Sequence, residues 1–315
     1  MSSLPTFGIV IPAWNAARWI DETLQSVSAQ TVRPSRVIVV DDGSTDDTCR
    51  IVSRYPGVEL IQQENAGAAT ARNTGFASMD TDLVQFLDAD DLIGDRFVEG
   101  ACKRFSETQY DIAFSPLIVM RLDGRRQRIF HYDSPPPPSQ IFDKWGFLLS
   151  QPPCSVVWRS AFVQMIGGWS SEKNPNDDGE IVMRAMLFDP KVAGFLTGEG
   201  YWRETSAPSL SKLRSSVGYR NDMAAMVNLA DLAKGRGLDY ALSSVTGRLY
   251  LDARAGFEIG DLELGREALA HARRLGLRGH PGAPAHTLLA SVFGLERKTR
   301  LADFIRCAAS HSGIK

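Results

Sequence analysis

The stretch that decides the fold class is residues 36–47, which read RVIVVDDGSTDD. Its first part, Arg36–Val40, is rich in β-branched side chains and predicts a buried strand. The strand stops at two aspartates and a glycine, and Ser44 with Asp47 predicts a capping box at the start of a helix. Residues 36–47 therefore describe a strand that passes through an acidic turn into a helix, as in a βα unit.

The same alternation extends over about the first hundred residues. Short apolar runs predict four strands: Phe7–Pro12, Arg36–Val40, Val58–Ile61 and Leu83–Leu87. Helices are expected between them, one capped by Asn15 with Ile20, Leu24 and Val27 at helical spacing, and one over Ala68–Phe76. Strands that alternate with helices predict an α/β fold with a mainly parallel sheet.

The pattern becomes less regular after residue 110. A strand is expected over Asp111–Met120, Arg128–Tyr132 would return beside it, and Pro135–Pro138 predicts an extended polyproline loop. The expected helices of the C-terminal part are Asp222–Leu232, Leu242–Phe257, Leu262–Leu275 and one from Ala285 to the terminus. We predict two domains, an α/β domain over residues 1–215 and a helical extension over residues 216–315.

The composition argues against several classes of protein. With 35 basic and 37 acidic residues the net charge is −2, which disfavours a dedicated nucleic-acid-binding protein. No apolar run approaches the roughly 20 residues that span a bilayer. The N-terminal residues indicate a strand rather than a signal peptide. The four cysteines form no CxxC pair, so we expect no metal knuckle or redox motif and a reduced, cytoplasmic setting.

Two acidic clusters directly follow predicted strands. Asp41 and Asp42 end the second strand, and Asp88, Asp90 and Asp91 end the fourth. In open α/β sheets ligands bind beyond the carboxyl ends of the strands, so both clusters are expected at one edge. A single acid there is most often a helix cap. Two close carboxylates repel unless a cation joins them, and Mg²⁺ or Mn²⁺ commonly links such carboxylates to substrate phosphates.

Motifs of other nucleotide-binding proteins are missing. The first strand is followed by Pro12-Ala13-Trp14-Asn15 where a dehydrogenase would carry GxGxxG, and the sequence holds no GxxxxGK[ST] P-loop. Two further segments are candidates. Gln63–Gly75 places Arg72 where it could meet a phosphate or a base edge, although a plain helix start is an equal alternative. Gly167–Trp169 precedes Asn176–Arg184, whose acids could equally be ordinary helix-start residues.

Together these segments resemble the family 2 glycosyltransferases, which have the GT-A fold, a Rossmann-like mixed sheet. The matching motifs are Val10–Asn15, Val39–Asp46, Asn65–Gly67 with Ala71–Asn73, Phe86–Asp91, and Gly167–Trp169 with Asp177–Asp178. They occur in the family's order and spacing and cover about residues 5–215, most strongly over the first hundred. The helical tail lies outside the resemblance.

The resemblance implies a role for each matching residue. Pro12 and Trp14 would line the nucleobase pocket, and Asp42 would accept a hydrogen bond from the base, typically uracil. Arg72 would lie near the base and the phosphates. Asp88 would hold the ribose side and contribute with Asp90 to a site for Mn²⁺ or Mg²⁺, in which Asp90 holds the ion that bridges the diphosphate. Asp178 would be the general base, because it matches the second acid of the family's Glu-Asp pair.

The sequence departs from the family pattern in two places. The first acid of that pair is Asp177 here. The family often carries Tyr-Arg-x-His near the end of the catalytic domain, and here Trp202-Arg203-Glu204-Thr205 takes that place. Thr205 would give less help in holding metal or diphosphate than a histidine, and Arg203 would carry more of that charge.

The activity implied by the resemblance is a single displacement with inversion. A sugar would pass from a nucleotide-diphospho-sugar, a UDP-sugar above all, to a hydroxyl of a surface glycan or glycolipid. One general base without a visible second nucleophile agrees with this outcome. A non-catalytic nucleotide-sugar-binding subunit of a glycan-assembly complex is the alternative. A nucleotidyltransferase is disfavoured, because the first strand is not followed by a Gly-rich, Arg-containing loop.

The last fifty residues carry a positive charge. Residues 266–315 hold nine basic and three acidic residues, a net charge of +6, and Arg297, Lys298 and Arg300 lie beside Phe293 and Leu295. Such a tail can rest on the anionic inner face of the plasma membrane, or it can be a solvated helix face, a homodimer contact or an acceptor platform. The sequence leaves these alternatives open.

Overall fold

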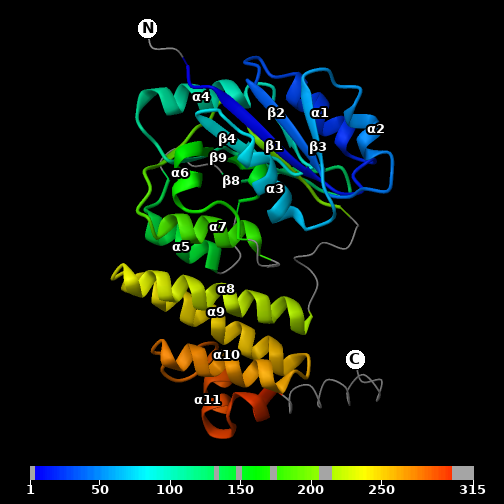
Figure 1. The fold of residues 1–315 in the computed structure, drawn as a ribbon. Helices are drawn as coiled ribbons and strands as arrows, with labels where there is room; N and C mark the ends of the chain where they lie inside the picture. Colours follow the sequence, from blue (N-terminus) through cyan, green and yellow to red (C-terminus); the bar gives the residue numbers. More distant parts are fainter. Residues whose placement is uncertain (1–3, 131–134, 147–150, 171–175, 206–214, 300–315) are drawn as a thin grey trace. The chain divides into compact units, whose positions relative to one another are not determined.

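The computed structural model describes residues 4–130, 135–146, 151–170, 176–205 and 215–299 (Figure 1). The chain forms two compact units. Of the described residues, the first unit holds 4–130, 135–141, 151–170 and 184–205, and the second holds 142–146, 176–183 and 215–299. The domain boundary at residue 215 stays a prediction.

The first unit is built on a seven-stranded sheet in the order β10-β6-β9-β4-β1-β2-β3. The strands are β1 (Phe7–Ala13), β2 (Arg36–Asp41), β3 (Val58–Gln62), β4 (Leu83–Phe86), β6 (Ile112–Phe114), β9 (Val156–Arg159) and β10 (Val192–Gly194). The four strands predicted from the first hundred residues are confirmed, and β3, β2, β1 and β4 run parallel. Only β9 is antiparallel to its neighbours, so the predicted α/β class is confirmed with a mixed sheet.

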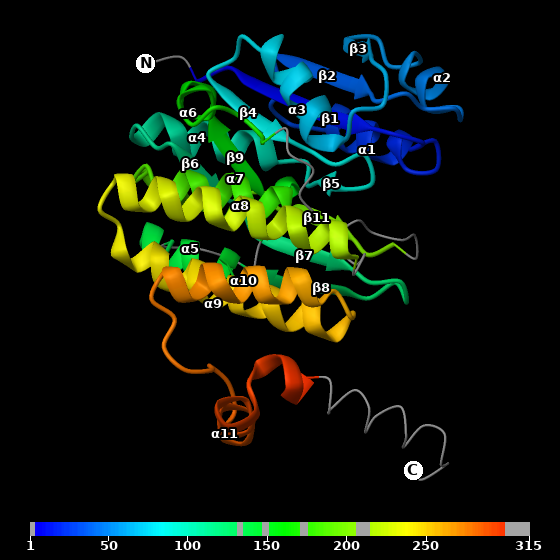
Figure 2. The ribbon, with the colours of Figure 1, turned by 60° about the horizontal axis from the view of Figure 1, so that its bottom comes forward.

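Helices cover both faces of this sheet (Figures 1 and 2). They are α1 (Ile20–Ser28), α2 (Thr48–Val52), α3 (Ala68–Ala77), α4 (Phe97–Glu107) and α6 (Ser160–Met165). Alternate residues of β1 and β2, such as Ile9 and Val39, join one core with α1, α2 and α4. The opposite face of β2 packs on α3, and a Cβ at Gly75 would lie 2.5 Å from Val10 Cγ1. Glycine thus allows α3 to lie close against the strands.

A second sheet has the order β5-β11-β7-β8. Its strands are β5 (Leu92–Ile93), β11 (Gly200–Arg203), β7 (Leu117–Met120) and β8 (Arg126–Phe130). The prediction of one strand over Asp111–Met120 was wrong, because the chain leaves the first sheet after Phe114 and enters the second at Leu117. Pro116 lies at the break, where its missing N–H removes a ladder donor. The predicted return beside it is confirmed as β8, although Tyr132 lies outside the described residues.

The predicted cap of the first helix was wrong. Asn15 does not cap α1: its backbone has a φ of 48°, and its Oδ1 accepts a hydrogen bond from Thr45 N at 2.9 Å. Helix α1 begins later, and its N-cap residue Trp19 makes no side-chain cap. Asn15 instead joins the loop after β1 to the loop after β2.

The predicted capping box of the second helix was wrong as well. Ser44 Oγ accepts from Asn15 N at 2.8 Å, and Asp47 makes no side-chain cap to α2. Asp46 supplies the acceptor instead, from Thr48 N at 3.0 Å. The local pattern correctly predicted that a helix begins here, but the Ser44 side chain bonds to the neighbouring loop instead of capping the helix.

The second unit consists mainly of helices. They are α8 (Ser216–Gly235), α9 (Asp239–Glu258), α10 (Leu262–Arg274) and α11 (Pro284–Phe293), and α5 (Pro138–Gly146) and α7 (Asp177–Met186) contribute residues to both units. Three of the four helices predicted for the C-terminal part are confirmed as α8, α9 and α10, with longer bounds for α8 and α9. Pro138 opens α5 instead of ending a loop. The predicted last helix is broken at Gly294, which has a φ of 78°, and residues 300–315 lie outside the described part.

Helices α8, α9 and α10 pack side by side (Figure 2). Ser215 caps α8 by accepting from Gly218 N, and Asp261 caps α10 by accepting from Leu264 N. A Cβ at Gly256 would lie 2.7 Å from Gly265 N, so two glycines bring α9 and α10 into close contact. Of the apolar tail residues, Phe293 is half exposed and Leu295 is buried, while Arg300 lies outside the described residues.

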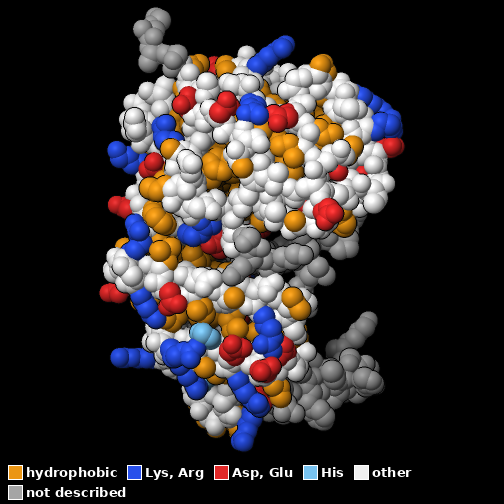
Figure 3. All heavy atoms as spheres, viewed as in Figure 1, with side chains coloured by type: hydrophobic (Ala, Val, Ile, Leu, Met, Phe, Trp, Pro, Cys, Tyr) orange, Lys and Arg blue, Asp and Glu red, His pale blue; other side chains and the backbone are white. Residues whose placement is uncertain are grey.

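Two further features concern the charged surface residues and the cysteines. Acidic and basic side chains are interspersed on the face shown in Figure 3. Cys49, Cys102 and Cys154 are free thiols. Among the described residues, none of the helices has both the length and the apolar character needed to cross a bilayer.

Candidate active site

The parallel sheet brings the two predicted acidic clusters to one edge. Ala13 pairs with Asp41 where β1 and β2 end, and Leu87 N, just after β4, donates to Val10 O at 2.9 Å. Since β2 and β4 both run parallel to β1, their carboxyl ends lie on the same side. Asp42 and the Asp88–Asp91 loop follow directly at this edge.

Asp42 organises the loop in front of α3. Its carboxylate is buried and accepts from Ala66 N at 2.9 Å, from Gly67 N at 2.8 Å and from Gln63 Nε2 at 2.7 Å. Gly67, with a φ of 95°, provides the left-handed turn that starts the helix. Asp42 therefore fixes the direction of α3, and its predicted contact with the base stays a prediction.

Helix α3 places Arg72 against the second acidic cluster. The Arg72 side chain is only 4% exposed, and its Nη2 lies 2.7 Å from Asp88 Oδ1. The guanidinium also stacks on the ring of Trp169, with Cζ 4.1 Å from the ring centroid. A guanidinium is always charged, and the carboxylate on one side and the indole face on the other hold it in one position.

Trp169 is itself held by α3. Asn73 donates from Nδ2 to Trp169 O at 2.8 Å and accepts on Oδ1 from Trp169 N at 2.9 Å. Gly168 has a φ of 69°, and a Cβ there would lie 2.7 Å from Asn73 Oδ1. The Trp169 ring meets Phe86 edge-on at a centroid distance of 5.2 Å. The Gly167–Trp169 segment thus closes over Arg72, a role that the sequence did not reveal.

The Asp88–Asp91 loop concentrates negative charge. Burial, followed by the charge of Asp88, raises the pKa of Asp90 to about 6. Burial and the two neighbouring carboxylates raise the pKa of the buried Asp91 well above its ordinary value. Asp91 Oδ1 accepts from Arg203 N at 2.9 Å. The loop is therefore tied to the end of β11, a contact that sequence spacing could not predict.

The carboxylates of this loop fit a divalent cation. Asp88 and Asp90 offer hard oxygen ligands whose mutual repulsion a bound cation would relieve. Among the described residues no group of three or more His, Cys, Asp or Glu side chains could hold a metal ion. Asp88 and Asp90 are the residues of this loop that would hold such an ion, and the predicted metal site stays a prediction.

The other predicted donor-site residues differ in exposure. Trp14 is 60% exposed, whereas Pro12 is buried in β1. The Arg203 guanidinium stacks on Trp19, 4.6 Å from the ring centroid, and bonds to Glu22 Oε2 at 2.6 Å. Arg203 is therefore engaged with α1 and, through its backbone, with the acidic loop.

Asp178 lies at the start of α7, in the second unit. Its backbone N–H donates to Asp177 Oδ1 at 2.9 Å, which uses Asp177 in the first turn of the helix. Asp42, Arg72, Asp88, Asp90 and Arg203 belong to the first unit, whereas Asp178 belongs to the second. Its role as the base stays a prediction.

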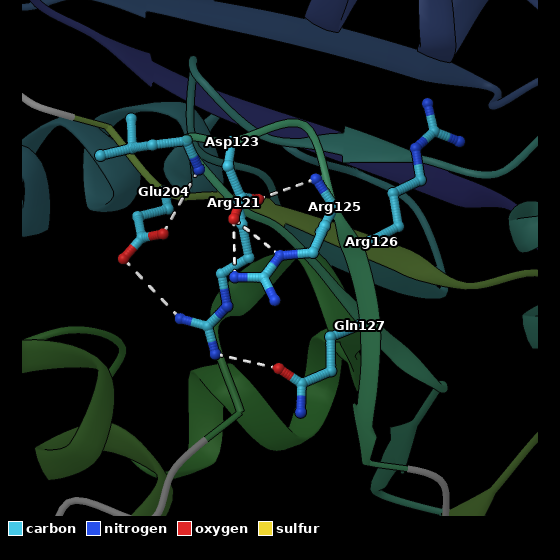
Figure 4. Close-up of a pocket in the computed structure, with 7 residues that line it drawn as sticks. Arg121, Asp123, Arg125, Arg126, Gln127 and Glu204 are labelled. Carbon is cyan, nitrogen blue, oxygen red and sulfur yellow. Dashed lines mark hydrogen bonds and ion pairs between the residues drawn. The ribbon is translucent and has the colours of Figure 1, made fainter.

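A pocket of 680 Å³ lies at the end of the second sheet (Figure 4). No role was predicted for its lining residues, which are Arg121, Leu122, Asp123, Arg125, Arg126, Gln127 and Glu204. All but Glu204 come from the β7–β8 hairpin. The signal in the sequence was four arginines within residues 121–128, which stand next to one aspartate.

Comparison with known proteins identifies the first unit. Residues 8–164 match the model of glycosyl transferase family 2. Glycosyltransferase GlyA of Streptococcus pneumoniae is 37% identical over 109 residues, 33% of this chain and 16% of GlyA. The uncharacterized glycosyltransferase YibD of Escherichia coli is 33% identical over 36% of this chain and 34% of its own length. The chain thus matches about a sixth to a third of these relatives.

The fold has a solved counterpart. The crystal structure of S. aureus TarS in complex with UDP-GlcNAc superimposes with a TM-score of 0.70, at 18% sequence identity, over 96% of this chain and 92% of that one. At this identity the similarity concerns the fold. Through residues 8–164 the chain belongs to glycosyl transferase family 2, and its fold is that of the GT-A glycosyltransferases.

Proposed function

We propose that the chain transfers a sugar from a nucleotide-diphospho-sugar, a UDP-sugar above all, to a hydroxyl of a glycan or glycolipid, with inversion. The observation that carries the proposal is the cluster at the sheet edge. There, one loop carries the carboxylates of Asp88 and Asp90, and Asp88 forms an ion pair with the fixed guanidinium of Arg72. Family membership supports it, and a solved counterpart holding UDP-GlcNAc supports a uridine nucleotide.

The donor would lie along the carboxyl ends of β1, β2 and β4. The exposed ring of Trp14 offers a face for the base, close in sequence to the buried Pro12 of β1, and Asp42 follows the neighbouring strand β2. Arg72 would meet the phosphates while keeping its contact with Asp88. Because Arg72 is already desolvated and oriented, donor binding would cost little further ordering of its side chain.

The metal requirement is part of the proposal. Asp90, with Asp88, would hold Mn²⁺ or Mg²⁺ together with the diphosphate. A bound divalent ion supplies stabilisation of the negative charge that develops on the leaving diphosphate. Arg203 lies near enough to Asp90 to lower its pKa and would add positive charge at the same place.

The chemical step needs a base for the acceptor. Asp178 would take the proton of the acceptor hydroxyl as its oxygen attacks the anomeric carbon. The bond from that carbon to the diphosphate oxygen breaks, and its electron pair leaves with the nucleoside diphosphate. A single displacement of this kind inverts the anomeric configuration.

The donor site is tested by calorimetry with the purified full chain. UDP, GDP, dTDP and CDP are titrated with Mn²⁺ and again with excess EDTA. We expect UDP to bind in the metal-dependent titration. If none of the nucleotides binds, the proposed donor site is refuted, and a partner-dependent or non-catalytic protein takes its place.

The base is tested by exchanging one of two neighbouring acids. Asp178→Asn is expected to keep UDP affinity and to lose transfer by a factor of about 10² to 10⁴. Asp177→Asn is the matched control and should retain most activity. Equal transfer by both variants would refute the assignment of Asp178. Donor binding without turnover in the unmodified chain would favour the alternative, a nucleotide-sugar-binding subunit.

A cytoplasmic setting, a membrane contact of the tail and a homodimer stay predictions.

A further inference from the structure

The pocket at the β7–β8 hairpin is a built feature of the fold. Gly124, with a φ of 81°, turns the hairpin, and Arg121 N donates to Arg125 O at 2.8 Å. Glu204 fastens the tip to β11, because its Oε1 lies 3.7 Å from Arg121 Nη1. Arg121 Nη2 also donates to Gln127 Oε1 at 3.1 Å (Figure 4). These contacts hold the polar wall of the pocket in a defined shape.

The lining favours a hydrophilic ligand. Leu122 is the single apolar side chain among the seven lining residues, and it is 64% exposed. The volume of 680 Å³ lies within the roughly 300–1,000 Å³ of small-ligand sites. A wall of carboxylates, guanidinium groups and an amide offers acceptors and donors side by side, which matches a chain of hydroxyl groups. A lipid tail or a nucleobase would need apolar or aromatic walls instead.

The hairpin also carries uncompensated positive charge. Asp123 accepts from Arg125 Nε at 2.6 Å, and Glu204 faces Arg121, so two of the four arginines are balanced. Arg126 and Arg128 are exposed, and neither forms an ion pair within the described part of the chain. Arg126 lines the pocket, with its guanidinium 5.6 Å from the Tyr201 ring centroid, and points away from the other labelled side chains (Figure 4). Free guanidinium groups of this kind bind carboxylates and phosphates.

The position of the pocket connects it with the proposed donor site. Glu204 N donates to Met120 O at 2.9 Å, where β11 and β7 end together. The preceding residue, Arg203, holds Asp91 through its backbone N–H. The pocket and the Asp88–Asp91 loop are thus joined by one strand end, but the pocket shares no lining residue with the donor cluster.

We propose that this pocket is the acceptor subsite and that it takes an anionic saccharide, a polyhydroxylated chain that carries carboxylate or phosphate groups. This inference rests on the proposed function. Hydroxyl groups of the acceptor meet Glu204, Gln127 and Asp123, and its negative groups meet Arg126 and, further along the chain, Arg128.

Three polyhydroxylated tetramers test the charge class. Full-length protein with UDP and Mn²⁺ is titrated with maltotetraose, with tetragalacturonate and with a tetramer of glycerol phosphate. We expect an anionic oligomer to bind at least about tenfold more tightly than the neutral one, and the better of the two identifies carboxylate or phosphate. Equal affinity for all three overturns the proposal. Equally strong competition by single-stranded DNA also overturns it, because the hairpin is then a general polyanion surface.

Variants locate the binding. Arg126→Gln with Arg128→Gln is expected to weaken anionic binding about tenfold, whereas the matched pair Arg50→Gln with Arg96→Gln, on exposed arginines of the same unit, leaves it unchanged. Gln127→Ala should weaken all three oligomers severalfold, and no effect would place binding outside the pocket and overturn the subsite. UDP affinity is measured in every variant. Retained UDP binding with no oligosaccharide effect refutes this inference alone, whereas absence of UDP binding in the unmodified chain refutes the proposed function.

Discussion

Replacement of Trp169 by leucine tests the idea that the Gly167–Trp169 segment positions Arg72. Trp169 is 4% exposed and covers the guanidinium at 4.1 Å from its ring centroid. Leucine keeps an apolar side chain and keeps the backbone that Asn73 binds, so the change removes the indole face selectively. We expect both a less stable first unit and a weaker nucleotide site.

The magnitude follows from three contacts. A desolvated cation–π contact contributes about 1–2 kcal/mol. The edge-on contact with Phe86, at 5.2 Å and 82° between ring planes, adds about 1 kcal/mol. Partial refilling by leucine leaves a cavity that costs about 1 kcal/mol more. The free energy of unfolding of the first unit should therefore fall by about 3–4 kcal/mol, and UDP affinity by about tenfold because Arg72 is no longer fixed.

The assay is urea unfolding followed by far-ultraviolet circular dichroism, together with hydrogen exchange of α3 and calorimetric titration of UDP. Trp202→Leu is the matched control, because Trp202 is 37% exposed and should lose less than about 1 kcal/mol. Trp169→Phe keeps an aromatic face and should restore part of the loss. If Trp169→Leu behaves like the control in stability and in UDP affinity, the positioning role of the indole is refuted.

Three further changes test other parts of the structure. Asp42→Ala removes the acceptor of two backbone N–H groups in front of α3 and should cost about 2 kcal/mol, measured by thermal unfolding. Asp42→Asn should cost less, and equal costs would contradict the role of this carboxylate in holding the loop before α3. Gly265→Ala places a Cβ 2.4 Å from the ring of Phe257 and should lower the stability of the helical unit by about 2 kcal/mol. Gly235→Ala, which has open space around it, should be neutral or stabilising. The opposite ranking in unfolding experiments would refute the close contact of α9 and α10. Burial, followed by the charge of Asp222, raises the pKa of Asp252 above its unfolded value, so its contribution to stability is complete below about pH 4 and is lost as the pH rises through the folded pKa. With Asp252→Asn, the free energy of unfolding should therefore decline less steeply between about pH 4 and neutral pH, as measured by urea unfolding at several pH values. An unchanged dependence of this free energy on pH would contradict the raised pKa.

The sequence was sufficient for those features that depend on local patterns. Apolar runs located β1 to β4, and the strand-helix alternation predicted that Asp42 and the Asp88–Asp91 loop share one edge. That prediction needs only the rule that parallel strands end on the same side. Side-chain identity within each loop was then enough to nominate Arg72, Asp88 and Asp90.

The features that the sequence missed depend on partners far along the chain. Asn15 and Ser44 have the composition of helix caps, but each bonds to the other's loop, and no local rule weighs a tertiary partner against a cap. Trp169 and Asn73 stand 96 positions apart, and their pairing follows from packing. The change of sheet at Pro116 has the same origin, because the proline removes a donor while the next strand finds new neighbours in β8 and β11.

The chain of contacts from Asp42 to Trp169 explains why one helix serves the whole donor site. Asp42 fixes the loop that leads into α3 at Gly67, α3 then presents Arg72 to Asp88, and the adjacent Asn73 holds the indole that covers Arg72. A shift of α3 along its axis would break all three contacts together, so a displacement at Gly67 would also alter the ion pair between Arg72 and Asp88. Substitution of Asp42 should therefore alter the surroundings of Asp88, although the two carboxylates share no hydrogen bond. In a double-mutant cycle, Asp42→Ala and Trp169→Leu should be non-additive, because either change releases the same helix.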